Sequence, residues 1–457
     1  MLAEPRARPA ETAWEPRIVA LVCNWCTYTG ADGAGTARRA YAPNVRIVRV
    51  LCTGRIDPLF ILKAFEQGAD GVIASGCHPG DCHYVRGNLF ARRRLSVFEK
   101  LMEFTGLDER RLHFTWVSAS EAVKWSRVVD EATRAVREAG PLGEWARPRG
   151  TTTIQLPEPD PAPRSRVPSN LSSGTDEALR AVALRILEEG RVGVVIGYMA
   201  GSLPGQMVPA FVASPADAGL LRWNDRCVNN LATYVPRALK QRPGQRVAVV
   251  LKTCDGRALA GLLRENQVKR SDVVVIGVAC DGIWNGERLA ARCYACAEAV
   301  TPLADVTVGT PAAERPTAPD PRAAQLAELK ALPVERRWNF WQSEFERCLR
   351  CYACRAVCPL CYCETCIADK TRPQWIPTSH SGAGNTAWNL TRAMHLAGRC
   401  IDCDECARAC PADIRLDLLN RAVAGDIADR FGYAAGADPG QLAPLTTFSP
   451  DDPDEFL

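Results

Sequence analysis

The sequence predicts an α/β protein with parallel sheets in an N-terminal and a middle domain, followed by a small cysteine-rich domain. Apolar strand-like runs alternate with helical segments before residue 300, which is typical of parallel sheets with helices on both faces. Many of the 21 cysteines follow those runs or stand at short, regular spacings further along. A length of 457 residues fits about three domains.

Two stretches rich in proline and polar residues, 141–170 and 301–335, are predicted to be extended linkers, because they lack the apolar residues of a core. They leave three predicted domains at residues 1–140, 171–300 and 336–457.

Bulk properties suggest a cytoplasmic protein. The N-terminal stretch has no apolar segment typical of a signal peptide, and no run of about 18 apolar residues would span a membrane. The net charge of +4 is spread along the chain, which argues against a nucleic-acid partner. Cysteines at metal-site spacings fit a reducing compartment better than disulfides do.

The N-terminal domain is expected to have four strands, with helices in DPLFILKAFEQGA and in residues 88–104. RIVALVC ends at Cys23, NVRIVRVLC at Cys52 and GVIASGC at Cys77, and RLHFTWVS is the fourth. Ligands of parallel sheets bind at the carboxyl ends of the strands. Four of five thiols at this edge are predicted to hold an iron–sulfur cluster, with a dithiol redox site or small apolar core residues as alternatives. The five are Cys23, Cys26, Cys52, Cys77 and Cys82.

The stretches VCNWCTYTGADGAGTARRAYAPNVRIVRVLCTGRIDP and GADGVIASGCHPGDCHY resemble the delta subunit of methyl-viologen-reducing hydrogenase. The resemblance implies one 2Fe-2S cluster on ligands among these five cysteines, and leaves open which one is spare. It also implies electron transfer between a hydrogenase or formate dehydrogenase and the flavin subunit of heterodisulfide reductase. His78 and His83 are candidates to tune the cluster by hydrogen bonding, with solvent-facing positions as the alternative.

The middle domain is expected to bring four cysteines together. After a helix in EALRAVALRILEEG and a strand in VGVVIGYMA, the strands VAVVLKTC and VVVIGVAC end at cysteines, and RCYAC adds two more. These four could hold a 4Fe-4S cluster, with zinc as the alternative. They are Cys254, Cys280, Cys293 and Cys296. Cys227 lies outside the pattern and is expected in the core or in a helix.

The residues KTCDGRAL, IGVACDG and RCYAC resemble the beta subunit of deazaflavin-reducing hydrogenases and related formate dehydrogenases. The resemblance implies one 4Fe-4S cluster on the four middle cysteines and an FAD that reduces a deazaflavin. The sequence offers no diagnostic flavin residues. Lys252 and Arg257 are either contacts for an anionic cofactor or solvated charges at a helix start. No G-x-G-x-x-G turn supports a dinucleotide site of the Rossmann type.

The C-terminal domain carries two runs of the form C-x2-C-x2-C-x3-C-P, CLRCYACRAVCP and CIDCDECARACP. This spacing holds two 4Fe-4S clusters in bacterial ferredoxins, where the fourth cysteine of each run binds the other cluster. One cluster is predicted on Cys348, Cys351, Cys354 and Cys410. The other is predicted on Cys400, Cys403, Cys406 and Cys358. A zinc site would need only four cysteines. The pattern resembles the dicluster ferredoxin domain and implies a small ferredoxin-like fold.

Three further segments are open to two interpretations each. In PLCYCETC, Cys361, Cys363 and Cys366 are extra ligands or thiols packed beside a cluster. The aromatic residues of RRWNFWQSEFERC cover the first cluster or form plain core. The acidic segment SPDDPDEFL, beyond a helix in LDLLNRAVAGDIADRFG, is disordered or a docking peptide for a partner.

Together these features predict an iron–sulfur electron-transfer subunit of a cytoplasmic multi-subunit oxidoreductase. The cysteine count fits about four clusters, and we expect one 2Fe-2S cluster and three 4Fe-4S clusters. No nucleophile–base pair stands out in the sequence, which favours electron transfer over catalysis. The expected partners are two other subunits, a flavin subunit like that of heterodisulfide reductase and one like a hydrogenase or formate dehydrogenase. One alternative is a chain that binds FAD and itself oxidises or reduces a soluble carrier, a deazaflavin or a nicotinamide. A zinc-stapled scaffold is the third hypothesis.

Overall fold

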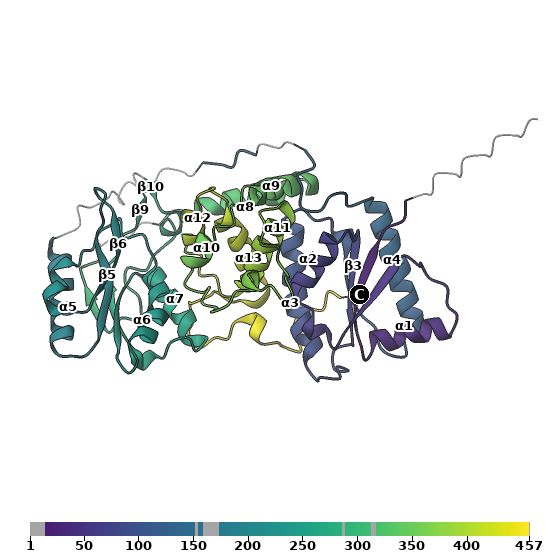
Figure 1. Ribbon diagram of the computed structural model, residues 1–457, viewed down its shortest axis with the longest axis horizontal. Helices are drawn as coiled ribbons and strands as arrows, with labels where there is room; N and C mark the ends of the chain where they lie inside the picture. Colours follow the sequence, from purple (N-terminus) through teal and green to yellow (C-terminus); the bar gives the residue numbers. More distant parts are fainter. Residues whose placement is uncertain (1–13, 151–153, 159–172, 286–287, 312–316, 457) are drawn as a thin grey trace, which may run out of the picture. The chain divides into compact units, whose positions relative to one another are not determined.

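The computed structural model describes residues 14–150, 154–158, 173–285, 288–311 and 317–456 (Figure 1). The chain divides into two compact units. Unit 1 contains the residues up to Glu103, Leu107–Arg147 and the segment from Phe448 onward. Unit 2 contains Phe104–Gly106 and Pro148–Thr447, so the middle and cysteine-rich C-terminal regions share one compact body.

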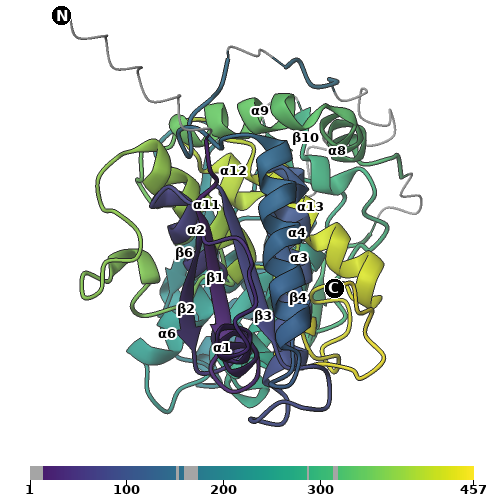
Figure 2. The same cartoon turned by 90° about the vertical axis from the view of Figure 1, so that its right-hand side faces the viewer.

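Unit 1 is built on a parallel sheet with strand order β2-β1-β3-β4 (Figure 2). The sheet lies between α2 and α3 on one side and α1 and α4 on the other (Figure 1). The central strands β1 and β3 are almost wholly buried, because helices cover both faces. Its elements are β1 (Ile18–Cys23), α1 (Thr27–Thr36), β2 (Val45–Val50), α2 (Pro58–Glu66), β3 (Gly71–Gly76), α3 (Gly87–Phe104), β4 (Leu112–Trp116) and α4 (Ala122–Ala139).

The segment from Phe448 to Phe456 packs onto unit 1, with which it forms one compact body. The Phe448 ring lies 5.2 Å from that of Phe90, and the Phe456 ring lies 4.7 Å from that of Trp116. Asp452 accepts hydrogen bonds of 2.5 and 2.7 Å from the guanidinium of Arg93. The acidic tail therefore docks on its own chain.

Unit 2 contains a five-stranded sheet with strand order β11-β8-β7-β5-β6. It is parallel except at the edge, where β6 runs antiparallel to β5. The sequence did not indicate β6, because Pro209 interrupts it; an edge strand tolerates a proline that a central strand would not. The elements of this part are α5 (Ser173–Glu188), β5 (Val194–Ala200), β6 (Met207–Val212), α6 (Val235–Gln241), β7 (Val247–Leu251), α7 (Thr253–Arg264), β8 (Val273–Val278), β9 (Trp284–Asn285), β10 (Arg288–Leu289) and β11 (Val306–Val308).

The rest of unit 2 is helical. Its helices are α8 (Pro321–Ala331), α9 (Val334–Glu346), α10 (Ala353–Ala356), α11 (Gly382–His395), α12 (Glu405–Arg408) and α13 (Leu416–Phe431). The aromatic residues of α9 form core, since the Trp341 ring lies 5.4 Å from that of Phe104 and 5.7 Å from that of Phe345. None of the described helices is both long and apolar enough to cross a membrane.

The predicted linker over residues 301–335 is not an extended connector. The short strand β11 pairs with β8, and α8 begins after Asp320, whose side chain accepts a hydrogen bond from the Arg322 backbone. Both elements are short, and the buried ion pair between Arg322 and Asp320 helps to anchor α8. The composition of the segment therefore resembles that of a linker. Much of the other predicted linker, 141–170, lies outside the described residues.

Candidate iron–sulfur sites

The five cysteines of unit 1 lie at or just beyond the carboxyl ends of its strands. β1 ends on Cys23, and β3 ends directly before Cys77. The Sγ atoms of Cys23 and Cys77 are 3.6 Å apart, and those of Cys52 and Cys82 are 3.7 Å apart. Cys26 also hydrogen-bonds to Cys77. The strand ends and their loops thus place all five thiols at one edge of the sheet.

A glycine leaves room for one of these pairs. A Cβ atom at Gly87, the first residue of α3, would lie 2.3 Å from Cys52 Sγ and 3.4 Å from Cys82 Sγ. The first distance is far inside van der Waals contact. The backbone at the start of α3 can therefore approach the two sulfurs only because residue 87 has no side chain.

The five thiols do not ionise alike. The hydrogen bond with Cys77 lowers the pKa of Cys23 to about 6, and the same bond raises the pKa of Cys77. Burial raises the pKa of Cys52 to about 11. Thiolates crowded in this way need positive charge to ionise together, which iron would supply. The donor set, soft sulfur held at short mutual distances, fits an iron–sulfur cluster.

His78 and His83, the two histidines proposed to tune the cluster, make contacts away from the strand ends. His78 Nε2 lies 2.7 Å from Glu121 Oε2. The exposed His83 ring stacks on Trp25 with ring centroids 3.7 Å apart, and its charge contributes to the low pKa of Cys23. His83 is therefore both a surface residue and an electrostatic neighbour of one candidate ligand.

The middle cysteines of unit 2 come from one helix and three loop positions. The prediction that Cys254 ends a strand is wrong. β7 stops at Leu251, and Cys254 lies in the first turn of α7. Asp255 in that turn favours an early helix start by complementing the helix dipole. Cys280 follows β8, and Cys293 closes a 3₁₀ turn over Ala291–Cys293.

These middle thiols are close enough to influence each other. Burial raises the pKa of Cys280 to about 12, and the charges of Cys293 and Cys296 act in the same direction. Burial likewise raises the pKa of Cys254. Cys227 is fully buried in the surrounding apolar core and lies in a loop. Of its two predicted positions, core or helix, the core position is the one observed.

Lys252 is a buried cation beside the middle cysteines. Its ammonium donates to Tyr198 Oη at 2.6 Å and to the Asn229 carbonyl at 2.7 Å, and it pairs with Asp255 at 2.8 Å. The solvated interpretation is therefore wrong for Lys252. It holds for Arg257, which is exposed and lies 3.8 Å from Glu298.

The two C-terminal cysteine runs share one backbone device. Arg350 and Tyr352 flank Cys351 with φ of 56° and 60°, and Asp402 and Asp404 flank Cys403 with φ of 58° and 51°. These left-handed positions wind the chain tightly around each second cysteine. A short helix follows each loop, α10 in the first run and α12 in the second.

The eight cysteines of the two runs line two separate cavities. The first cavity is lined by Cys348, Cys351, Cys354 and Cys410, together with Trp388 and Asn389. The second is lined by Cys358, Cys400, Cys403 and Cys406, together with Arg392 and Asn420. Each cavity draws its fourth cysteine from the other run, in the grouping that the spacing predicts. Which residues ligate a cluster stays a prediction.

Polar side chains from helices reach both cavities, and sequence reasoning missed them. Asn389 hydrogen-bonds to Cys348, and Asn420 Nδ2 lies 3.5 Å from Cys406 Sγ. Arg392 is buried and donates to the Cys354 carbonyl at 3.0 Å. Its Nε–H is also buried and has no partner among the described residues. The sequence did not single these residues out, because both helices carry other polar residues as well.

The three cysteines of the insert are not gathered. Cys361 hydrogen-bonds to Cys358, which lowers the pKa of Cys361, whereas Cys363 is exposed and Cys366 hydrogen-bonds to Arg355. Among the described residues, no three Cys, His, Asp or Glu side chains converge as ligands of a single metal ion would. The insert mainly supplies α11, which packs between α9 and α13.

Two protein-family models match the chain. The model of the methyl-viologen-reducing hydrogenase, delta subunit, matches residues 18–140, and that of the 4Fe-4S dicluster domain matches residues 339–415. The intervening residues lie outside these two matches. The matches support the sequence resemblance for the N-terminal and C-terminal parts and leave the middle one without such support.

Relatives of known name are similar to parts of the chain. An iron–sulfur subunit of the F420-non-reducing hydrogenase vhc of Methanococcus voltae is 48% identical over 128 residues, covering 28% of this chain and 89% of that protein. One subunit of the ferredoxin:CoB-CoM heterodisulfide reductase of Methanosarcina mazei is 39% identical over 153 residues, covering 34% of this chain but only 19% of that protein. A chain of the F420-reducing [NiFe] hydrogenase complex of Methanosarcina barkeri is 17% identical, with a TM-score of 0.20 over 24% of this chain and 38% of that chain, too low to support an argument.

Proposed function

Because the chain belongs, through residues 18–140, to the family of the methyl-viologen-reducing hydrogenase delta subunit, we propose that it relays electrons within a multi-subunit oxidoreductase. In this proposal the N-terminal cysteines hold a 2Fe-2S cluster, and the middle and C-terminal cysteines hold three 4Fe-4S clusters. Iron–sulfur clusters carry single electrons, and their reduction potentials depend on burial and hydrogen bonding. The chain's own residues set those two conditions.

The observation that carries the proposal is the pair of cysteine-lined cavities in unit 2. Each is lined by four thiols, an asparagine from a helix and apolar side chains, and the second cavity also has charged residues in its lining, Arg392, Asp404 and Glu405. Burial keeps the pKa of Cys400 and Cys406 high, at about 12, so these thiols resist ionisation until positive charge enters the cavity. This environment suits a metal cluster held in a mostly apolar pocket.

The proposed partners follow from the relatives. One relative is an iron–sulfur component of a hydrogenase, and another is a component of a heterodisulfide reductase. We therefore propose two electron-exchanging neighbours, one like a hydrogenase or formate dehydrogenase and one like the flavin subunit of heterodisulfide reductase. The middle region would then be a domain similar to the deazaflavin-reducing hydrogenase beta subunit, placed in the sequence between the two parts that match known families.

In the part of the chain that the structure describes, the two cations considered for an anionic cofactor have partners within the protein. Lys252, the cation that the sequence offered to an anionic cofactor, is engaged with Tyr198, Asp255 and backbone carbonyls. Arg257 is exposed and paired with Glu298. Flavin content nevertheless distinguishes the two functions directly.

The test is the amount of iron, acid-labile sulfide, zinc and flavin per chain in anaerobically purified full-length protein. We expect about 14 iron atoms with equal sulfide, the sum for one 2Fe-2S and three 4Fe-4S clusters, and no flavin. One flavin per chain, with carrier-dependent activity, would favour the enzymatic alternative. Zinc in place of iron and sulfide would overturn the electron-transfer proposal.

A further inference from the structure

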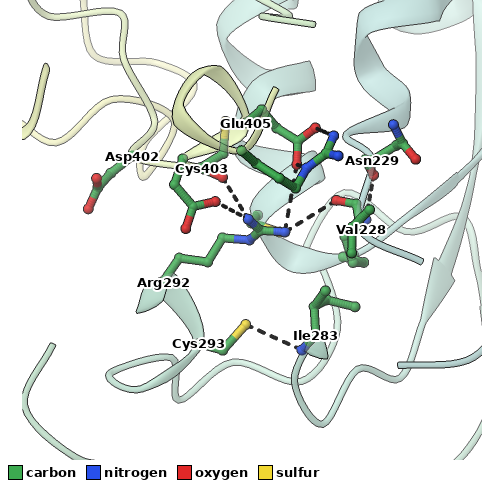
Figure 3. A network of polar contacts seen from close by, with 12 residues as sticks. Val228, Asn229, Ile283, Arg292, Cys293, Asp402, Cys403 and Glu405 are labelled. Carbon is green, nitrogen blue, oxygen red and sulfur yellow. Dashed lines mark hydrogen bonds and ion pairs between the residues drawn. The ribbon is translucent and has the colours of Figure 1, made fainter. Parts of the chain in front are cut away.

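Arg292 connects two of the cysteine sites in unit 2. It directly precedes Cys293 of the middle site, and its Nη1 donates to the carbonyl of Cys403 at 2.7 Å (Figure 3). Its Nη2 donates to the Val228 carbonyl at 3.2 Å. One side chain therefore joins the loop that carries a middle cysteine to the loop that carries a C-terminal one.

Two carboxylates near Cys403 stabilise the positive charge of Arg292. Its guanidinium forms an ion pair with Asp404 and lies 3.8 Å from Glu405. The Arg292 side chain is only 7% exposed, so it would be costly to bury without these carboxylates. Burial alone would lower its pKa, but Asp404, Cys254 and Cys293 hold the pKa well above the usual value.

The Arg292 side chain starts next to the middle site, because it belongs to the same 3₁₀ turn as Cys293. Its Nε–H is buried and has no hydrogen-bond partner among the described residues. A buried, unpaired donor next to candidate ligands is a common way to stabilise the negative charge of a cluster.

We propose that Arg292 is a positioning residue that couples the middle cysteine site electronically to the site of Cys400, Cys403 and Cys406. It fixes the Cys293 loop against the Cys403 loop, and its charge raises the reduction potential of the middle cluster. The inference rests on the proposed function. One-electron reduction adds one negative charge to a cluster, and a cation fixed nearby stabilises that reduced form. Without it, the middle cluster would accept an electron from its neighbour less readily.

The first test compares full-length wild type with Arg292→Met by redox titration followed by electron paramagnetic resonance (EPR). A Cys254→Ala variant identifies the titration wave of the middle cluster. In Arg292→Met we expect that wave to move to lower potential by at least tenfold in the reduction equilibrium, about 59 mV for a one-electron couple. The matched control is Arg288→Met, which removes a side chain that is 80% exposed on β10. It should leave the wave in place.

A second pair of variants separates charge from positioning. Arg292→Lys keeps the charge but cannot span both carbonyls, so the potential should stay near wild type while magnetic coupling between the reduced clusters weakens. Asp404→Asn leaves Arg292 intact, accommodates the left-handed backbone of this position, and removes its charged anchor. It should also weaken the coupling.

Iron and sulfide are measured on every sample. If Arg292→Met keeps its full iron content and an unshifted middle wave, the inference is overturned while the relay proposal stands. If Arg292→Met does not assemble, the Lys and Asn variants decide, and unchanged coupling in both overturns it. If wild type itself contains no iron and sulfide, the proposed function fails first.

Discussion

The cysteine edge of unit 1 and the cysteine cavities of unit 2 handle crowded thiols in different ways. In unit 1, the cysteine sulfurs lie against one another, and the pKa values of Cys23 and Cys77 diverge because they share one proton. In unit 2, buried Arg392 lies beside one cavity, and its charge is felt by Cys354, Cys358 and Cys406. Unit 1 balances thiolate charge among the thiols, whereas unit 2 balances it with arginine.

The arginines of unit 1 serve another purpose. Arg92 and Arg93, both on α3, hold the tail segment through the Ser449 carbonyl and Asp452. A buried guanidinium can thus stabilise a redox site or a chain segment, depending on what faces it. The comparison implies that arginine substitutions in unit 2 change potentials, while those in unit 1 change local stability.

The largest expected effect is the loss of a whole cluster from unit 2. Cys403→Ala removes one wall of the second cavity, so the protein should contain about four fewer iron atoms. Iron analysis and EPR would check this, with the N-terminal 2Fe-2S spectrum unchanged. Cys363→Ala, at the exposed insert cysteine, is the control and should keep all its iron. Retention of every cluster spectrum in Cys403→Ala would refute the ligand assignment.

Next in size is the loss of the unit 1 cluster by overpacking. The methyl group of Gly87→Ala would collide with Cys52 Sγ, which lies 2.3 Å from the added Cβ. Such overpacking typically costs about 1–3 kcal/mol, so we expect loss of the 2Fe-2S spectrum and no change in the 4Fe-4S spectra. Gly35→Ala, which has open space around its Cβ in the same unit, should bind iron normally. An intact 2Fe-2S spectrum in Gly87→Ala would indicate that Cys52 is the spare cysteine among the five.

A smaller effect is expected when a cation of unit 2 is removed. Arg392→Met deletes positive charge beside the second cavity, so one 4Fe-4S wave should move to lower potential, on the order of 60 mV for a tenfold change in the equilibrium. Redox titration with EPR detection measures it. Arg347→Met removes an arginine side chain that is 48% exposed and should shift the waves less. Equal shifts in both variants would show that burial of the arginine beside the cavity does not determine the size of the effect.

The smallest effect concerns the tail of unit 1. Burial opposes ionisation of Asp452, but hydrogen bonds from Arg93 and the Ser449 backbone outweigh it and lower its pKa. A carboxyl with a lowered folded pKa stabilises the tail fully above its unfolded pKa of about 3.9 and loses this effect as pH falls through the folded value. Arg93→Gln should weaken tail docking by about 1.5–3 kcal/mol at neutral pH.

Hydrogen exchange of residues 449–456 and Trp116 fluorescence report this docking, since Trp116 Nε1 donates to Asp454 at 2.9 Å. Lys100→Gln, on an exposed part of the same helix, is the control. The cluster spectra should be the same in both variants. A changed 2Fe-2S potential in Arg93→Gln would show that the arginines of unit 1 also tune a redox site.

The sequence predicted the fold class because strand-like runs alternate with helical segments. The α/β architecture is confirmed. β1 ends on a cysteine, β3 ends directly before one, and β8 ends two residues before Cys280. The prediction failed where local pattern and tertiary context disagree. Cys254 lies in a helix, because apolar β7 residues run directly into α7 without a turn residue between them.

The polar environment of the cysteines could not be predicted from one sequence. Arg292, Arg392 and Asn420 belong to different segments, and only folding brings them to thiols far away in the chain. The tail was expected to be disordered or to bind a partner, because its acidic composition does not identify a complementary arginine on α3. Spacing predicts ligand groups; charge compensation depends on long-range contacts.

The tail has a consequence for biosynthesis. Since Phe448 to Phe456 packs into unit 1, two parts of this compact unit are separated along the chain by unit 2. Ribosomes synthesise all of unit 2 before the residues that cover Phe90 and Trp116 exist. This apolar surface of the nascent N-terminal part therefore stays uncovered until the residues up to Phe456 have been translated.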